Sequence, residues 1–163
     1  MPMKNLDDLF VHMLRDVFYA ERQIQKTLPR MARKAQSEEL REAFEQHAEE
    51  TAEQIEKLER IFEMRDLKPR GTTCDAMNGI LEEAKEIMSE CEDKDALDAA
   101  LIASAQAVEH YEIARYGTMA AWARQLGMDE AASIIAEILT QEKATDDKLS
   151  QLAETSLNQQ AAA

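Results

Sequence analysis

Apolar side chains recur at steps of three and four residues along five segments of the chain, the spacing that gathers them on one face of a helix. The first segment starts at a cap, Asn5 or Asp7, and continues to about Gln36. Its apolar stripe consists of Phe10, Leu14, Val17, Ile24, Leu28 and Met31. The second segment starts after Ser37, a favourable N-cap, and fades around Asp66. Its stripe consists of Leu40, Phe44, Ile55, Leu58 and Phe62.

A linker at residues 68–72, with the sequence Lys-Pro-Arg-Gly-Thr, separates these two segments from the rest. A shorter helix is expected over residues 74–91, with apolar residues on one side. Asp95 is expected to cap the fourth helix. Gly127 is placed to end it, because glycine tolerates the left-handed conformation that closes many helices.

The last helix is expected to start at Asp129, and the tail over residues 158–163 is expected to fray. Four long helices, two tight hairpins and one long connection predict an all-α four-helix bundle whose crossover carries a short fifth helix. That helix spans about 27 Å at 1.5 Å per residue, enough to run along the bundle. Residues 1–163 form a single domain in this interpretation.

Composition narrows the possible functions. Only 4 Gly and 3 Pro are present, which fits long helices. The net charge of −14 argues against binding to nucleic acid, because an acidic surface repels phosphate. No apolar run approaches the roughly 20 residues of a membrane span. The N-terminus shows no secretion signal and the two cysteines form no disulfide framework, so the cytoplasm is the expected location.

Carboxylates occupy positions where the helical pattern predicts core residues. At 100° per residue, Glu21 falls on the stripe of the first helix, Glu112 on that of the fourth and Glu142 on that of the last. The second helix has His47 at its stripe centre and Glu50 at one edge. Counted from the two hairpin turns, all four helices offer a carboxylate at about mid-height. An isolated buried carboxylate costs several kcal/mol unless it is paired or bound to a metal.

The crossover adds a test of this layer. If the crossover returns to the end of the bundle where the second helix starts, the fourth helix starts there too. His47 and Glu109 then lie on the same side of the carboxylates and can serve one site. Four to six inward carboxylates with one imidazole form an oxygen-rich ligand set that suits iron or manganese better than zinc or copper. Bridging carboxylates commonly hold two ions about 3.5–4 Å apart.

Two structural alternatives stay open at this point. Arg115 lies one turn from Glu112 and can pair with it, or the buried acids can be protonated; in either case the chain would be a non-enzymatic helical dimer. His47 can be a core histidine with satisfied hydrogen bonds instead of a ligand. Pairing of the acids with Arg115 predicts a protein that is indifferent to metal.

Four motifs resemble the YciE/YciF family of bacterial stress-response proteins, in the ferritin-like superfamily. They are Tyr19-Ala-Glu21, His47-x-x-Glu50-Thr51, Glu109-His-Tyr-Glu112-Ile-Ala and Glu142-x-x-Thr145-Asp146. The resemblance covers roughly residues 4–157 and implies a ferritin-like bundle, a homodimer and a di-metal centre. The chain departs from the usual Glu-x-x-His ligand pattern, because Glu53 and Thr145 stand where histidines are expected.

The combined interpretation is a cytoplasmic, stress-linked protein that binds two divalent metal ions between four helices. Iron is the preferred metal, and manganese is the second candidate. If it is redox active, it oxidises ferrous iron or consumes peroxide. Whether it is an enzyme is left open. The expected metal ligands are Glu21, His47, Glu50, Glu109, Glu112 and Glu142, with Asp146 as a lesser candidate.

Overall fold

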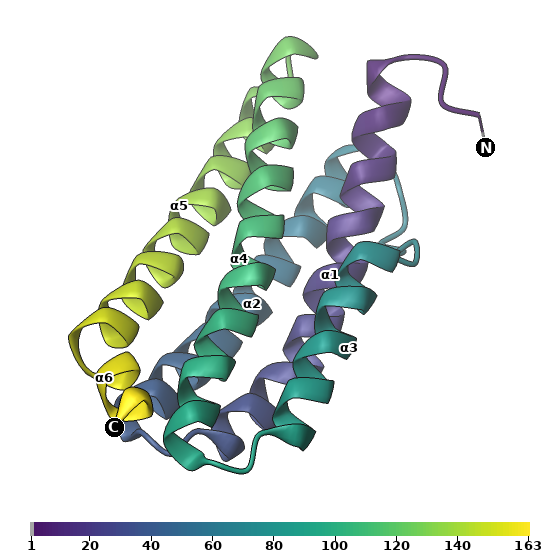
Figure 1. Ribbon diagram of the computed structural model, residues 1–163. Helices are drawn as coiled ribbons and strands as arrows, with labels where there is room; N and C mark the ends of the chain where they lie inside the picture. The colour runs from purple at the N-terminus through teal and green to yellow at the C-terminus, as the bar shows by residue number, and fades with distance from the viewer. Residues whose placement is uncertain (1) are drawn as a thin grey trace.

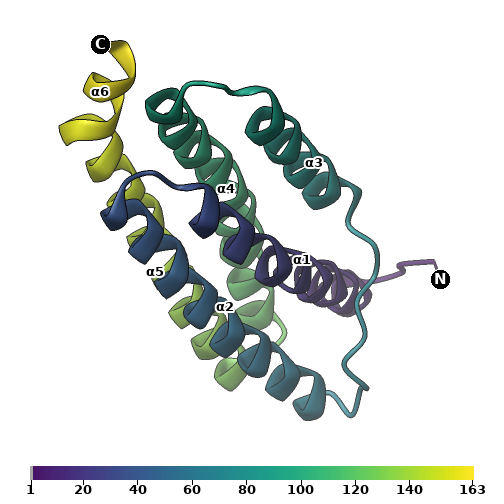
Figure 2. The same cartoon turned by 90° about the horizontal axis from the view of Figure 1, so that it is seen from below.

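The computed structural model describes residues 2–163, and its four long helices form a bundle with one long crossover (Figure 1). The four are α1 (Leu6–Lys34), α2 (Glu38–Met64), α4 (Lys94–Gln125) and α5 (Asp129–Leu152). The short helix α3 (Asp75–Glu90) packs on the outside against α1 and α4 (Figure 2). The all-α bundle with a fifth helix in its crossover, predicted from the sequence, is confirmed.

The predicted helix ends hold in most places. The Asn5 side chain accepts a hydrogen bond from Asp8 N, and Ser37 caps α2 by accepting from Leu40 N. Gly127 has a φ of +72°, the left-handed conformation that its position after α4 requires. The predicted cap of α4 is wrong by two residues, because the carboxylate that accepts from Ala96 N belongs to Asp93.

The tail also differs from its prediction. A five-residue π-helical turn, Ala153–Leu157, follows α5, and the short helix α6, Asn158–Ala162, follows the turn. The frayed tail expected over residues 158–163 is therefore helical through residue 162. Ala153 and Leu157 are buried and belong to the apolar core, and the turn and α6 both contact α4. This burial holds the end of the chain against α4. The polar residues of the tail gave no sign of this packing.

The crossover is held close to α1. The backbone N–H of Thr72 donates to the carbonyl of Arg15 at 3.1 Å, and a Cβ on Gly71 would lie only 2.9 Å from the Cβ of Tyr19. Glycine therefore permits this close passage. In Figure 1, α2 and α4 both rise from the lower end of the bundle, so the crossover does reverse the end from which α4 enters.

One buried carboxylate fixes the height of α4. Both oxygens of Asp98 accept hydrogen bonds from the α1–α2 turn, from Gln36 N at 2.7 Å and from Ser37 N at 2.8 Å. Because the turn and the start of α4 are tied together, residues a few turns further along α4 face fixed positions on α2.

The core consists of two apolar clusters with a polar layer between them. One cluster contains Ile24, Phe44, Leu101 and Leu149, and the other contains Leu14, Leu58, Met119 and Ile138. Between the two clusters each long helix contributes buried polar side chains. These are Glu21, His47, Thr51, Gln54, Glu109, Glu112 and Glu142.

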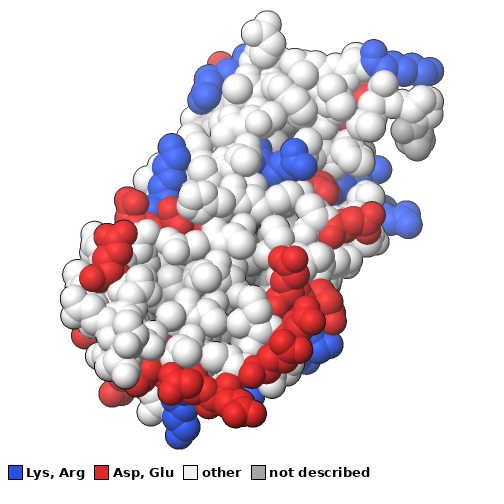
Figure 3. All heavy atoms as spheres, in the orientation of Figure 1, with Lys and Arg blue, Asp and Glu red and all other residues white. Residues whose placement is uncertain are grey.

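Charge on the surface is uneven. On the face shown in Figure 3, acidic side chains gather over the lower part of the molecule, where α3 and the start of α4 lie. Basic side chains are spread over the upper part of the same face. No helix within residues 2–163 is long and apolar enough to cross a membrane.

Candidate metal centre

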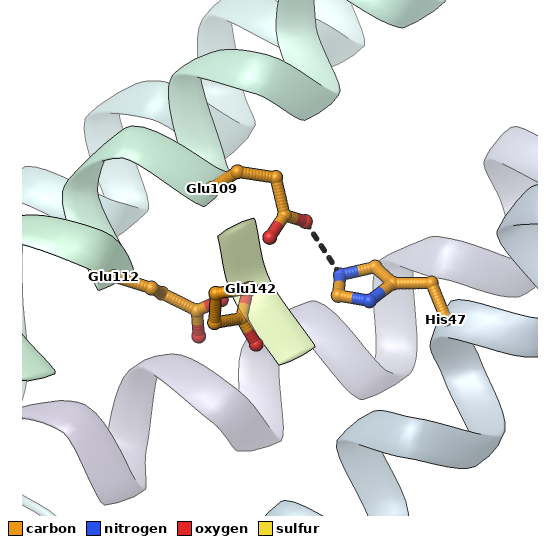
Figure 4. A group of neighbouring side chains, drawn as sticks. All are labelled: His47, Glu109, Glu112 and Glu142. Carbon is orange, nitrogen blue, oxygen red and sulfur yellow. Dashed lines mark ion pairs between the residues drawn. The ribbon is translucent and has the colours of Figure 1, made fainter. Parts of the chain in front are cut away.

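Four side chains from three helices converge in the polar layer (Figure 4). They are His47 of α2, Glu109 and Glu112 of α4, and Glu142 of α5. One nitrogen or oxygen of each lies within 4.8 Å of the corresponding atoms of the other three. The exposed fraction of each residue is 3% or less. Glu109 and Glu112 share a face because residues three apart on a helix are neighbours.

Glu21 joins this group from α1. It is fully buried, and its Oε1 accepts a hydrogen bond from the hydroxyl of Tyr116 at 2.5 Å. The charges of Glu21, Glu112 and Glu142 act on one another, which places Glu21 beside the cluster. Sequence reasoning missed Tyr116. Its spacing of four residues after Glu112, on a core stripe, is the signal that could have identified it.

The polar atoms of this layer lack partners. Both oxygens of Glu109, Glu112 and Glu142 are buried without a hydrogen bond, as is Oε2 of Glu21. No Lys or Arg among residues 2–163 forms an ion pair with any of these four glutamates. Buried polar groups are ordinarily satisfied, so this concentration of unpartnered oxygens indicates that a cation or protons neutralise the layer.

The contact between His47 and Glu109 confirms the predicted effect of the crossover. Nε2 of His47 lies 2.7 Å from Oε1 of Glu109, so the two residues are on the same side of the layer. The pair is nevertheless not aligned as a hydrogen bond, and both ring nitrogens of His47 count as unpartnered. The contact is short enough for the two atoms to share a proton or to bind one cation together.

The donor set fits a metal ion in type and approximately in spacing. Carboxylate oxygens with one imidazole suit iron or manganese. Atoms that bind one ion at about 2.1 Å can lie up to about 4.2 Å apart. The observed separations of up to 4.8 Å therefore need only a small contraction.

Burial and mutual repulsion favour protons on these acids when no cation is present. Burial, followed by the charge of Glu142, raises the pKa of Glu21 to about 8, against an opposing hydrogen bond from Tyr116. Burial also raises the pKa values of Glu109 and Glu112 well above the usual range, and neighbouring glutamates add to both shifts. Burial lowers the pKa of His47, but contacts with Glu109 and Glu50 outweigh it and raise the value well above normal.

Arginine pairing, one of the two structural alternatives, is wrong. The guanidinium of Arg115 lies over the ring of Tyr111, with Cζ 5.0 Å from the ring centroid. Glu112 keeps two buried oxygens without a partner. Arg115 therefore turns toward the α3 side of α4, where Tyr111 donates a hydrogen bond to Asp16 and contacts Cys74.

Two expected ligands lie outside the cluster. Glu50 is partly exposed and accepts hydrogen bonds from Gln46 and Thr145, with Oε2 at 4.0 Å from Nδ1 of His47. Asp146 accepts from Gln106 and contacts His110, whose side chain is 67% exposed. The structure thus brings together five of the seven expected residues, namely Glu21, His47, Glu109, Glu112 and Glu142.

Comparisons with known proteins place this chain in a family. Residues 5–162 match the family described as domain of unknown function (DUF892). The protein YciF of Escherichia coli K12 is 46% identical over 162 residues, which cover 99% of this chain and 98% of YciF. The crystal structure of that stress protein superposes with a TM-score of 0.91 at 46% identity and covers 96% of this chain and 99% of its own.

Two further solved structures are similar. YcfI from Rhodopseudomonas palustris, for which a structural role has been suggested, has a TM-score of 0.89 at 47% identity and covers 90% of this chain and 94% of its own. A protein from Xanthomonas campestris pv. campestris has a TM-score of 0.72 at 26% identity and covers 93% of this chain and 92% of its own.

Proposed function

The chain belongs to the DUF892 family, as a homologue of the stress protein YciF, and on that premise we propose that its polar layer binds two divalent transition-metal ions. Iron is the first choice and manganese the second. The observation that carries this proposal is a group of four buried glutamates. Seven of their eight carboxylate oxygens have no hydrogen bond, and none of the four pairs with a Lys or Arg within residues 2–163.

The residues divide between two ions by their neighbours. His47, Glu109, Glu112 and Glu142 would hold the first ion, because their ligand atoms already lie together. Glu21, which lies close enough to Glu112 and Glu142 for their charges to interact, would help these two residues to hold the second ion. When bound, the two metal ions would supply the electron transfer by which a peroxide is reduced and ferrous iron is oxidised.

The surrounding side chains prepare this ligand set. The hydroxyl of Tyr116 orients Glu21 by its hydrogen bond and leaves Oε2 free to bind. The apolar clusters on either side of the polar layer limit the water within it, which strengthens every electrostatic interaction there. Ligation requires the glutamates to be ionised and His47 to be neutral, so uptake of metal releases protons.

Metal analysis tests the proposal directly. Protein purified without affinity tags that bind metal, from cells grown in iron- and manganese-containing medium, is expected to carry up to about two metal ions per chain. The variants Glu112→Ala and Glu142→Ala are expected to lose most of this metal. The matched control Glu49→Ala changes an exposed glutamate of α2 and is expected to keep it.

A protein that carries no iron or manganese, and whose melting temperature responds to neither, would favour the structural alternative. In that alternative the buried acids are neutral, which their raised pKa values allow, and the chain is a non-enzymatic helical dimer. Both readings include a homodimer, which light scattering checks. The cytoplasmic location belongs to the proposal as well, and cell fractionation tests it.

A further inference from the structure

A cleft between α2 and α5 reaches the buried cluster from the surface. Its volume is about 130 Å³, which is room for several water molecules. Polar side chains line it on both helices: Gln46, His47 and Glu50 on α2, and Thr145 and Lys148 on α5. His47 is a member of the buried cluster, so this cleft connects solvent with the candidate metal centre.

Glu50 is held at the mouth of this cleft by both helices. Its Oε1 accepts from Gln46 Nε2 at 2.9 Å, and its Oε2 accepts from Thr145 Oγ1 at 3.3 Å. Lys148 donates to the amide oxygen of Gln46 at 3.2 Å, which bridges the mouth. The Glu50 side chain is 23% exposed, so its carboxylate meets water on one side and His47 on the other.

The imidazole of His47 forms the inner wall. Its Nε2 faces Glu109 at 2.7 Å, and its Nδ1 lies 4.0 Å from Oε2 of Glu50. Nδ1 is buried and has no hydrogen-bond partner. The ring therefore stands between the carboxylate at the surface and the glutamates inside.

A second cavity touches the cluster on the other side, between α1, α3 and α4. It also reaches His47 and Glu109, but apolar side chains such as Ile24, Leu81 and Val108 dominate its lining. Its volume of about 10 Å³ is marginal even for one water molecule. Because a divalent ion gives up its water shell reluctantly, such a cavity is a poor path for it, whereas the polar cleft offers replacement ligands.

We propose that the α2–α5 cleft is the entrance through which a hydrated divalent cation reaches the cluster, and that Glu50 is its first ligand. This inference rests on the proposed metal-binding function and adds a route to it. Glu50 attracts the cation at the surface and passes it to the buried ligands beyond His47. Lys148 opposes this step, because its positive charge repels the cation and its bond to Gln46 narrows the mouth.

The test measures the rate of metal uptake separately from the final occupancy. Metal-free protein is mixed with cobalt(II) in a stopped-flow instrument, and a metal-sensitive dye reports the fall in free cobalt(II). Glu50→Gln is expected to slow uptake about tenfold and Lys148→Gln to quicken it severalfold, since local charge changes on-rates by factors of 10 and more. The exposed control Glu49→Gln removes the same charge next to Glu50 and is expected to change the rate less than about twofold.

The final occupancy, measured after equilibration and gel filtration, is expected to be equal in all four proteins. Equal uptake rates for wild type and Glu50→Gln, with equal occupancy, would overturn the entrance and leave the metal site standing. The same holds if Leu81→Ala, which widens the apolar cavity, quickens uptake while Glu50→Gln does not slow it. Absence of cobalt(II) from the wild type at equilibrium would overturn the metal-binding function itself, and the entrance with it.

Discussion

Replacement of Glu21 by glutamine is expected to stabilise the metal-free protein at pH 8 and to leave it nearly unchanged at pH 5. The amide is uncharged at both pH values and close in shape to a protonated carboxyl group. Its oxygen can still accept the hydrogen bond from Tyr116. The substitution therefore removes the titration of Glu21 and little else.

The sign and size follow from the pKa of Glu21, which rises from 4.5 to about 8 on folding. A group whose pKa is higher in the folded state contributes its full stability to the fold at pH values below its unfolded-state pKa. This contribution is lost as the pH rises through the folded-state pKa. Between the two pKa values, each pH unit changes the free energy of unfolding by about 1.4 kcal/mol. Between pH 5 and pH 8 the wild type therefore loses on the order of 4 kcal/mol through this group, and Glu21→Gln does not.

Urea unfolding with a metal chelator, followed by circular dichroism at pH 5, 6, 7 and 8, measures this difference. The gap between variant and wild type is expected to open steadily with pH. Glu49→Gln, which alters an exposed glutamate, controls for the general effect of net charge and is expected to show no such gap. A Glu21→Gln protein that is no more stable than wild type at pH 8 would refute the buried, proton-binding layer.

Four further outcomes are expected. Manganese(II) or ferrous iron at about 100 times its Kd should add about 2.7 kcal/mol and raise the melting temperature by about 5–10 °C, more at pH 8 than at pH 5, because ligation needs ionised glutamates. In thermal melts, Glu112→Ala should lose most of this response and cost the metal-free protein little, since it removes a repelling charge. Tyr116→Phe should cost about 1–3 kcal/mol in urea unfolding, because it leaves an oxygen of Glu21 buried without a donor. Gly71→Ala should cost about 1–3 kcal/mol in the same assay, because its Cβ would meet Tyr19 at 2.9 Å.

The helices and most of the cluster were predictable because both depend on the helical repeat. Apolar residues at steps of three and four define the buried stripe, and a glutamate on that stripe is buried wherever the helices pack. Glu21, Glu112 and Glu142 are predicted on this ground, and their burial is confirmed. The crossover argument placed Glu109 beside His47 for a similar reason, since direction and height decide which residues meet.

The positions at the edge of a stripe were not predictable in the same way. Glu50 lies three residues after His47, which turns it by about 60° around α2. A rotation of the helix by that amount decides whether Glu50 or His47 faces the interior, and packing against α5 sets the rotation. The structure turns His47 inward and Glu50 to the cleft. The hydrogen bond from Tyr116 to Glu21 likewise joins residues 95 apart, which no local pattern encodes.

The division of the core explains how the chain tolerates its buried acids. Replacing a buried charged group by an apolar residue is often neutral or stabilising, so a bundle of this length gains nothing in stability from four glutamates. The two apolar clusters on either side contain the large core residues, and each spans several helices without help from the layer. Stability and ligand binding can therefore reside in different layers of one bundle. Substitutions in the clusters should act on folding, and substitutions of the four glutamates should act mainly on the response to pH and metal.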